Sequence, residues 1–115
     1  MSVKKNYTGP EYEMVKEVNG GFRVSPSGNL GYFAAMDLEA LLSQIIHENK
    51  KINLQIELSN VTNIADSRIV SLLLEMQWKA RKRKINFTLT EANPSVEATF
   101  KAMSVYDVLF TSTSK

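Results

Sequence analysis

The sequence of 115 residues contains no cysteine and only one histidine, His47. The absence of cysteine excludes disulfide bonds, thiolate metal ligands and cysteine nucleophiles. A single histidine excludes a multi-histidine zinc site and argues against a histidine-based catalytic triad. Glycine is scarce as well, and neither GxxxxGK[ST] nor GxGxxG occurs, so a phosphate-binding loop is not indicated. We therefore expect a protein that is not an enzyme, with no catalytic residue, no metal and no cofactor.

Long apolar runs and a strong net charge are also missing. No apolar stretch approaches the ~20 residues that span a bilayer, and residues 1–6 lack the apolar core of a signal peptide. We expect a cytoplasmic protein without membrane insertion. Fourteen basic and 12 acidic residues give a net charge of +2, too small an excess for a nucleic-acid-binding surface. The basic run from Arg81 to Lys84 has no interleaved aromatic residue and is interpreted as a solvated helix end, so no direct nucleic-acid partner is expected.

The hydrophobic share of 43% is enough for one domain with a single core. We expect a flexible tail over residues 1–10, one domain over 11–111 and a flexible end over 112–115. Apolar residues alternate with polar ones on both sides of Asn19-Gly20-Gly21. Asn-Gly favours the tight turn of a β-hairpin, since both turn positions adopt positive φ, and a hairpin is predicted here.

Helical and strand periodicities then alternate along the chain. Apolar residues at helical spacing predict helices over about 35–49 and from about Asp66 or Ser67 to the basic run, and alternation predicts strands over 52–58 and 85–89. Asn93-Pro94 marks the start of a third helix. The polar alternation of the strands indicates helices on one face only. The predicted fold class is α/β, with a small mixed four-to-five-stranded sheet, an N-terminal antiparallel hairpin, and three or more helices packed mainly on one face.

The most informative stretch is residues 60–74, where a strand end leads through a polar loop into an apolar helix. Ligands and partners of open α/β sheets bind outside the carboxyl ends of the strands, which is where this loop is expected. A serine at a helix N-terminus also suits a phosphate group, because the free N–H groups and the helix dipole stabilise negative charge. Simple capping of the helix by Asp66 or Ser67 explains the same residues.

The chain resembles the STAS family, the fold of the bacterial anti-sigma factor antagonists, over about residues 12–110. The resemblance centres on Val61-Thr62, Ile64 and Asp66-Ser67, followed by the leucine-rich helix. Residues 22–30 are similar to the second strand and the turn of the family, and residues 53–58 to its strand before the central loop. Asn93-Pro94-Ser95-Val96 and residues 100–110 are similar to its last helix and closing strand. The resemblance implies a STAS-like single domain.

The resemblance further implies a protein-binding switch. In such antagonists a serine kinase, which is also the anti-sigma factor, phosphorylates the serine after the loop aspartate and thereby ends binding. Ser67 matches that serine, and the partners implied are such a bacterial kinase and a phosphatase. The residues expected at the partner-binding surface are Asp66, Arg68, Ile69, Asn29, Tyr32 and Phe33.

The sequence departs from the family pattern in ways that keep alternatives open. The loop holds one extra residue, which we assign to Ala65; a gapless alignment would instead place Asp66 at the phosphorylation site, as a fixed phosphate mimic. Ile69 replaces a small residue, and Gly31 replaces an acidic one. A second hypothesis is that the protein is a constitutive STAS subunit or regulator of a membrane transporter or signalling assembly. In that case exposed aromatic residues such as Trp78 would make a permanent contact.

Overall fold

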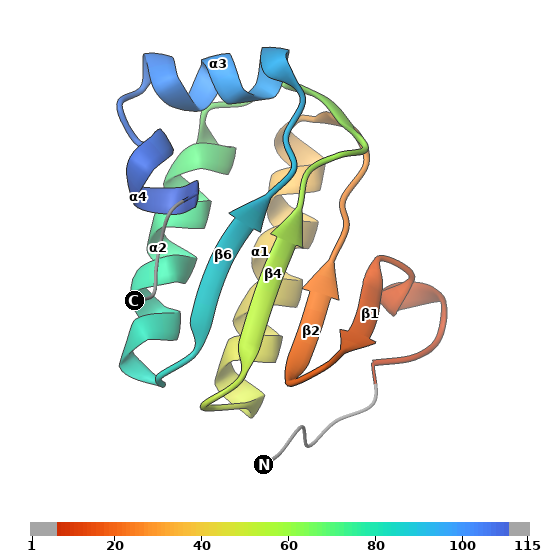
Figure 1. Ribbon diagram of the computed structural model, residues 1–115. Coiled ribbons are helices and arrows are strands. Elements are labelled where there is room, and N and C mark those ends of the chain that lie inside the picture. The colour runs from red at the N-terminus through yellow and green to blue at the C-terminus, as the bar shows by residue number, and fades with distance from the viewer. Residues whose placement is uncertain (1–6, 111–115) are drawn as a thin grey trace.

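A four-stranded sheet forms one layer of the domain (Figure 1). The computed structural model describes residues 7–110. The strand order is β1-β2-β4-β6, with β1 antiparallel to β2 and the other pairs parallel. The bounds are β1 Val15–Val18, β2 Gly21–Val24, β4 Asn53–Glu57 and β6 Asn86–Thr90. The predicted hairpin is confirmed, with Val18 paired to Gly21 across the turn.

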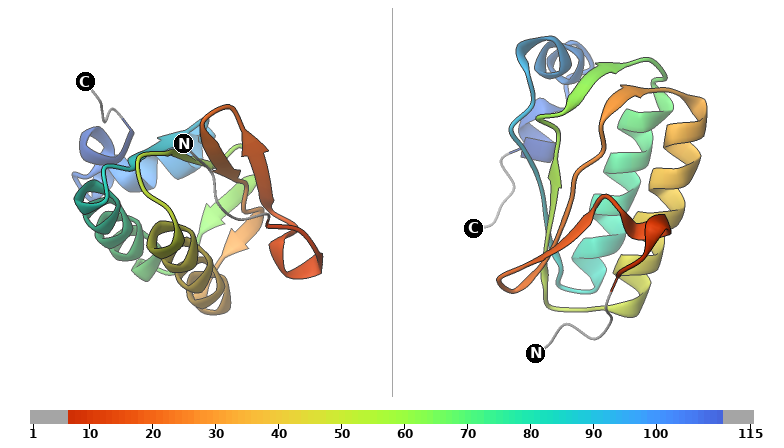
Figure 2. Two further views of the ribbon diagram at one scale, coloured as in Figure 1. Left: turned by 90° about the horizontal axis from the view of Figure 1, so that it is seen from below. Right: turned by 90° about the vertical axis from the view of Figure 1, so that its right-hand side faces the viewer.

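Two long helices, α1 (Tyr32–Glu48) and α2 (Arg68–Lys82), form the second layer and cover one face of this sheet (Figure 2). Within β4, Leu54 and Ile56 point into the core and are fully buried. Gln55 and Glu57 alternate with them on the other face, where Gln55 accepts from Arg23 of β2 and Glu57 accepts from Ser25, the residue after β2. The predicted α/β class, with helices mainly on one face of a mixed sheet, is therefore confirmed.

A second, two-stranded parallel sheet was not predicted. It pairs β3 (Gly28–Leu30) with β5 (Val61–Ile64). Residues 61–64 belong to the segment interpreted as a polar loop, and two of them, Thr62 and Asn63, are exposed. Such a short strand carries no readable alternation, so only its partner reveals it. The first helix also begins at Tyr32 rather than near Ala35.

The C-terminal part ends in helices. As predicted, Asn93 caps α3 (Pro94–Ala102), with its side-chain oxygen accepting the Val96 N–H at 2.9 Å. The expected closing strand is wrong: residues Tyr106–Phe110 form helix α4. This helix lies beside β6 and α2 and buries Leu109, while Phe110 contacts Phe100 with ring centres 5.3 Å apart.

Residues before the predicted domain boundary at residue 11 pack against the domain. Tyr7 is buried, and its hydroxyl donates to Glu48 Oε1 at 2.8 Å and accepts from Asn49 Nδ2 at 3.2 Å. A 3₁₀ turn over Pro10–Tyr12 follows. The rest of the expected tail, residues 1–6, and the expected flexible end, 112–115, lie outside the described residues. Between residues 7 and 110, no helix has the length and apolar character to cross a bilayer.

Candidate functional site

The β3–β5 pair brings the segments before α1 and α2 together at one end of the domain. Asn63 Nδ2 donates to Asn29 Oδ1 at 2.9 Å, and the Ala65 N–H donates to the Leu30 carbonyl at 2.9 Å. Leu30 is buried between these contacts and the core. Because both helices start directly after this pair and pack along each other, their N-termini are fixed side by side.

The N-terminus of α2 is capped by Asp66 and not by Ser67. Asp66 Oδ1 accepts the backbone N–H of Arg68 at 2.9 Å, whereas Ser67 occupies the N-cap position without a side-chain capping bond. This backbone bond, together with the Arg68 guanidinium, holds the pKa of the Asp66 carboxyl below its ordinary value. Ser67 is exposed, so its hydroxyl faces solvent at the positive end of the helix dipole.

Arg68 connects the start of α2 to the start of α1. Its Nη2 lies 3.2 Å from Asp66 Oδ2, and its guanidinium carbon lies 4.6 Å from the centre of the Tyr32 ring. Tyr32 in turn contacts Phe33 edge-to-face, with ring centres 5.3 Å apart. Both aromatic side chains are open to solvent, Tyr32 at 47% and Phe33 at 76% exposure. Arg68 thus connects the start of α2, where Ser67 lies, to two exposed aromatic rings of α1. Arginine and aromatic side chains are enriched at protein-binding surfaces.

A hollow of about 270 Å³ continues this surface along the two helices. Tyr32, Ala35 and Met36 line it from α1, and Arg68, Ser71 and Leu72 line it from α2. Met36 is itself 50% exposed. Glu39 and Glu75 line the hollow further along the two helices, so its apolar part is limited to the first turns of α1 and α2.

The residues predicted for the site divide into two groups. In the first group, Arg68 contacts both Asp66 and Tyr32, and Tyr32 contacts Phe33. Ser67 lies between Asp66 and Arg68 in the sequence, and Asn29 lies at the same end of the domain on β3. Ile69 is different. Its side chain is fully buried in the core, which corrects the expectation that it lies on the docking surface. The physical reason is helical geometry: Ile69 shares the inward face of α2 with Leu73 and Met76.

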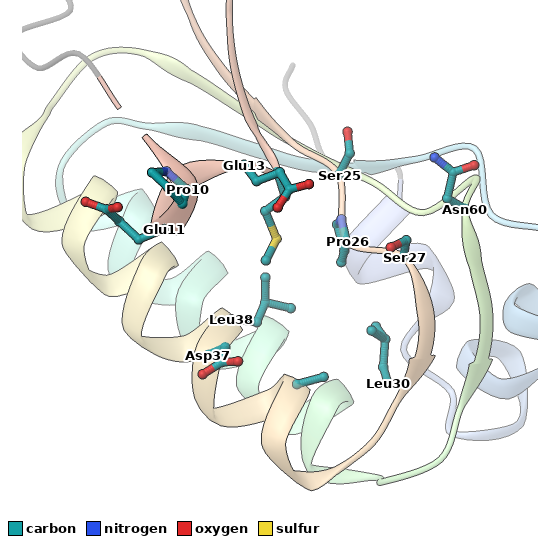
Figure 3. Close-up of a pocket in the computed structure, with 12 residues that line it drawn as sticks. Pro10, Glu11, Glu13, Ser25, Pro26, Ser27, Leu30, Asp37, Leu38 and Asn60 are labelled. Carbon is teal, nitrogen blue, oxygen red and sulfur yellow. The ribbon is translucent and has the colours of Figure 1, made fainter. Parts of the chain in front are cut away.

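A larger hollow of about 470 Å³, which the sequence did not predict, lies on the other side of α1 (Figure 3). Leu30 and Leu38 contribute apolar lining, and Glu11, Glu13 and Asp37 contribute carboxylates. Its walls come from the first 3₁₀ turn, the segment after β2, and α1, so no local sequence signal could indicate it. No group of side chains suited to a metal ion occurs among residues 7–110.

A family model described as "Mlab, STAS domain" matches residues 15–110. The chain belongs to the STAS family. The matched region runs from β1 to α4 and therefore contains the whole candidate site. No curated protein sequence matches the chain significantly.

Solved structures support the same fold for this STAS domain. The anti-sigma factor antagonist SpoIIAA in its unphosphorylated form aligns with a TM-score of 0.72 and 16% identity, over 86% of each chain. An anti-sigma factor antagonist from Mycobacterium paratuberculosis aligns with a TM-score of 0.71 and 21% identity, over 85% of this chain and 83% of the other. At these identities the likeness concerns the fold.

Proposed function

We propose that this STAS domain is a protein-binding switch of the anti-sigma factor antagonist type, controlled by phosphorylation of Ser67. Its partner would be a serine kinase that is also an anti-sigma factor, and a phosphatase would restore the binding form. The observation that carries the proposal is the exposed Ser67 side chain, which makes no capping bond and directly precedes Arg68, whose guanidinium lies over the exposed Tyr32 ring. The domain performs no chemistry itself in this scheme.

Electrostatics supplies the switching mechanism. A phosphate on Ser67 adds about two negative charges, which the N-terminus of α2 and the Arg68 guanidinium stabilise. The same charge lies at the edge of the surface formed by Tyr32 and Phe33, where a partner would have to approach. Phosphorylation therefore changes the binding surface without a rearrangement of the fold.

The geometry also bears on the choice between Ser67 and Asp66 as the phosphorylation position. The Asp66 side chain is only 19% exposed, and it is engaged by both the backbone and the guanidinium of Arg68. Ser67 is the more accessible of the two and has the freer side chain. This difference supports Ser67 as the phosphoacceptor and gives Asp66 the role of shaping the helix start.

The test compares Ser67→Ala with Ser71→Ala, a matched change of an exposed serine one turn further along α2. Each tagged variant is purified from its native cells, bound proteins are identified, and phosphopeptides are mapped by mass spectrometry. We expect a serine kinase in the bound fraction, phosphate on residue 67 of the wild type and of Ser71→Ala, and none on Ser67→Ala. A kinase that still phosphorylates Ser67→Ala would overturn the assignment.

A permanent STAS subunit of a transporter or signalling assembly is the second candidate. It is favoured by the exposed apolar side chains of Tyr32, Phe33 and Met36 on the first turns of α1, which a phosphoswitch at Ser67 does not by itself require. In that case Phe33→Ala should release the bound partner, whereas Ser67→Asp should leave it bound. Under the phosphoswitch, Ser67→Asp should release it as well.

A further inference from the structure

The end of the domain opposite Ser67 carries a cluster of cations that no single sequence segment contains. The turns that follow α1 and α2 meet there, at the bottom of Figure 1. The Lys51 N–H donates to the Arg83 carbonyl at 3.1 Å, and Arg83 Nε donates to the Asn49 carbonyl at 2.7 Å. These bonds fix two basic segments against each other. We call the combined set the basic end: Lys50, Lys51, Arg81, Lys82, Arg83 and Lys84.

Within residues 7–110, no ion pair joins a cation of the basic end to a carboxylate. Among the described residues, cations form ion pairs at Arg68 with Asp66 and at Lys79 with Glu75, and neither pair involves the basic end. Glu48, the acidic residue nearest to it in sequence, accepts the Tyr7 hydroxyl. The basic end therefore presents six positive charges together.

The remainder of the described chain is strongly negative. All 12 acidic residues of the protein lie among the described residues outside the basic end, where five cations accompany them, an excess of seven negative charges (12 − 5). Those cations are Lys16, Arg23, Arg68, Lys79 and Lys101, and the three remaining lysines of the sequence lie outside the described residues. Within residues 7–110, the basic end and the remainder therefore carry opposite charges. An anionic surface would attract the basic end and repel the rest, so it would also orient the molecule.

An exposed tryptophan adjoins the basic end. Trp78 is 55% exposed, and Lys82 Nζ lies 3.7 Å from the centre of its ring. Tryptophan is enriched at membrane–water interfaces, because its apolar ring and its N–H group suit the two environments that meet there. Clusters of four to eight lysines and arginines are likewise a feature of proteins that bind anionic lipid headgroups.

We propose that the basic end and Trp78 form a site for the surface of an anionic lipid bilayer. Proteins that bind single-stranded nucleic acid hold it in a groove, with its bases stacked on several aromatic rings. Neither of the two hollows described above is lined by Trp78 or by a residue of the basic end, so neither provides such a groove there. A helix of 15 residues spans about 22 Å, so Ser67 and the aromatic surface at the start of α2 would face away from the bilayer. This inference is independent of phosphorylation at Ser67.

Vesicle co-sedimentation tests the proposal. The probes are vesicles of phosphatidylcholine alone and of equal parts phosphatidylcholine and phosphatidylglycerol. Lys82→Gln/Lys84→Gln removes two charges from the basic end, and Lys16→Gln/Lys101→Gln removes two exposed charges elsewhere. At about fivefold per charge, the first variant should bind anionic vesicles about 25-fold more weakly than the wild type. The second, with the same net charge, should bind within about twofold of the wild type.

Tryptophan fluorescence gives an independent readout, because Trp78 is the only tryptophan in the protein. Its emission should shift to the blue on addition of anionic vesicles and stay constant with phosphatidylcholine alone. Equal loss of binding in the two double variants would overturn the proposal, as would the absence of binding by the folded wild type. Tighter binding of the basic end to a single-stranded RNA than to anionic vesicles at the same salt would also overturn it and assign the site to nucleic acid.

Discussion

The guanidinium of Arg68 is shared between the Asp66 carboxylate, 3.2 Å away, and the Tyr32 ring, whose centre lies 4.6 Å away. Arg68 therefore joins the residue beside the proposed phosphorylation site to the exposed aromatic surface of α1. A charge placed on Ser67 would compete for the same guanidinium. Since arginine binds phosphate bidentately and more strongly than it stacks on an exposed ring, the phosphate is expected to win.

Phosphorylation of Ser67 is accordingly expected to draw Arg68 away from Tyr32. The measurement is the NMR chemical shift of the Tyr32 ring protons in the phosphorylated and unphosphorylated proteins. In Arg68→Ala the ring has no cation over it in either state, so phosphorylation should move these signals far less. Equal shifts in the wild type and in Arg68→Ala would show that Arg68 does not transmit the charge.

Substitutions at Ile69 should act on stability. Ile69 is fully buried, so truncation to alanine removes core contacts and leaves a cavity, which costs about 2–5 kcal/mol of the free energy of unfolding. Ile69→Val should cost about 0.5–1.5 kcal/mol. Both values are measured by urea denaturation. Partner binding by the folded Ile69→Val protein should equal that of the wild type; a selective loss of binding would restore Ile69 to the docking surface.

Two glycines should respond in opposite ways to an added side chain. A Cβ on Gly21 would collide with the Asn53 carbonyl of the neighbouring strand, so Gly21→Ala should destabilise the domain by about 3 kcal/mol. A Cβ on Gly31 meets nothing within 4 Å, and Gly31 is the N-cap of α1 without a side-chain bond. Gly31→Asp should raise the free energy of unfolding by a few tenths of a kcal/mol. Destabilisation by Gly31→Asp as large as by Gly21→Ala would contradict this geometry.

Tyr7 should make the stability of the protein sensitive to alkaline pH. Burial, followed by the bond to Glu48, raises the pKa of its hydroxyl well above the ordinary value of 10.0. The unfolded chain therefore ionises first, and the contribution of Tyr7, present below pH 10, declines as the pH rises further. Tyr7→Phe should lose about 1–2 kcal/mol at neutral pH, through the lost hydrogen bonds, and show a weaker decline above pH 10.

Thermal unfolding from neutral to alkaline pH compares the two proteins. The substitution keeps the ring that packs on Phe22, with centres 4.9 Å apart, and so isolates the hydroxyl. Identical pH profiles for the wild type and Tyr7→Phe would mean that the hydroxyl of Tyr7 is not buried in the folded protein.

Local patterns in the sequence predicted most of the fold, because they indicate which face of its own helix or strand each residue occupies. The alternation around Leu54 and Ile56, the Asn19-Gly20 turn and the Asn93 cap all depend on neighbours in sequence. The strand expected at α4 came from the resemblance to the family, and the five residues of α4 are too few for their own periodicity to indicate a helix. The β3–β5 pair was missed because each strand is stabilised by the other, which is distant in sequence.

The same distinction between local pattern and packing applies to the candidate site. The order and spacing of residues are enough to predict that a serine follows an aspartate at the start of an apolar helix. The contact of Arg68 with Tyr32, the burial of Ile69 and the bond between Lys51 and Arg83 depend on how separate elements pack in three dimensions. Contacts between elements depend on how their faces pack, and periodicity within one element holds no information about which residues of another element lie opposite.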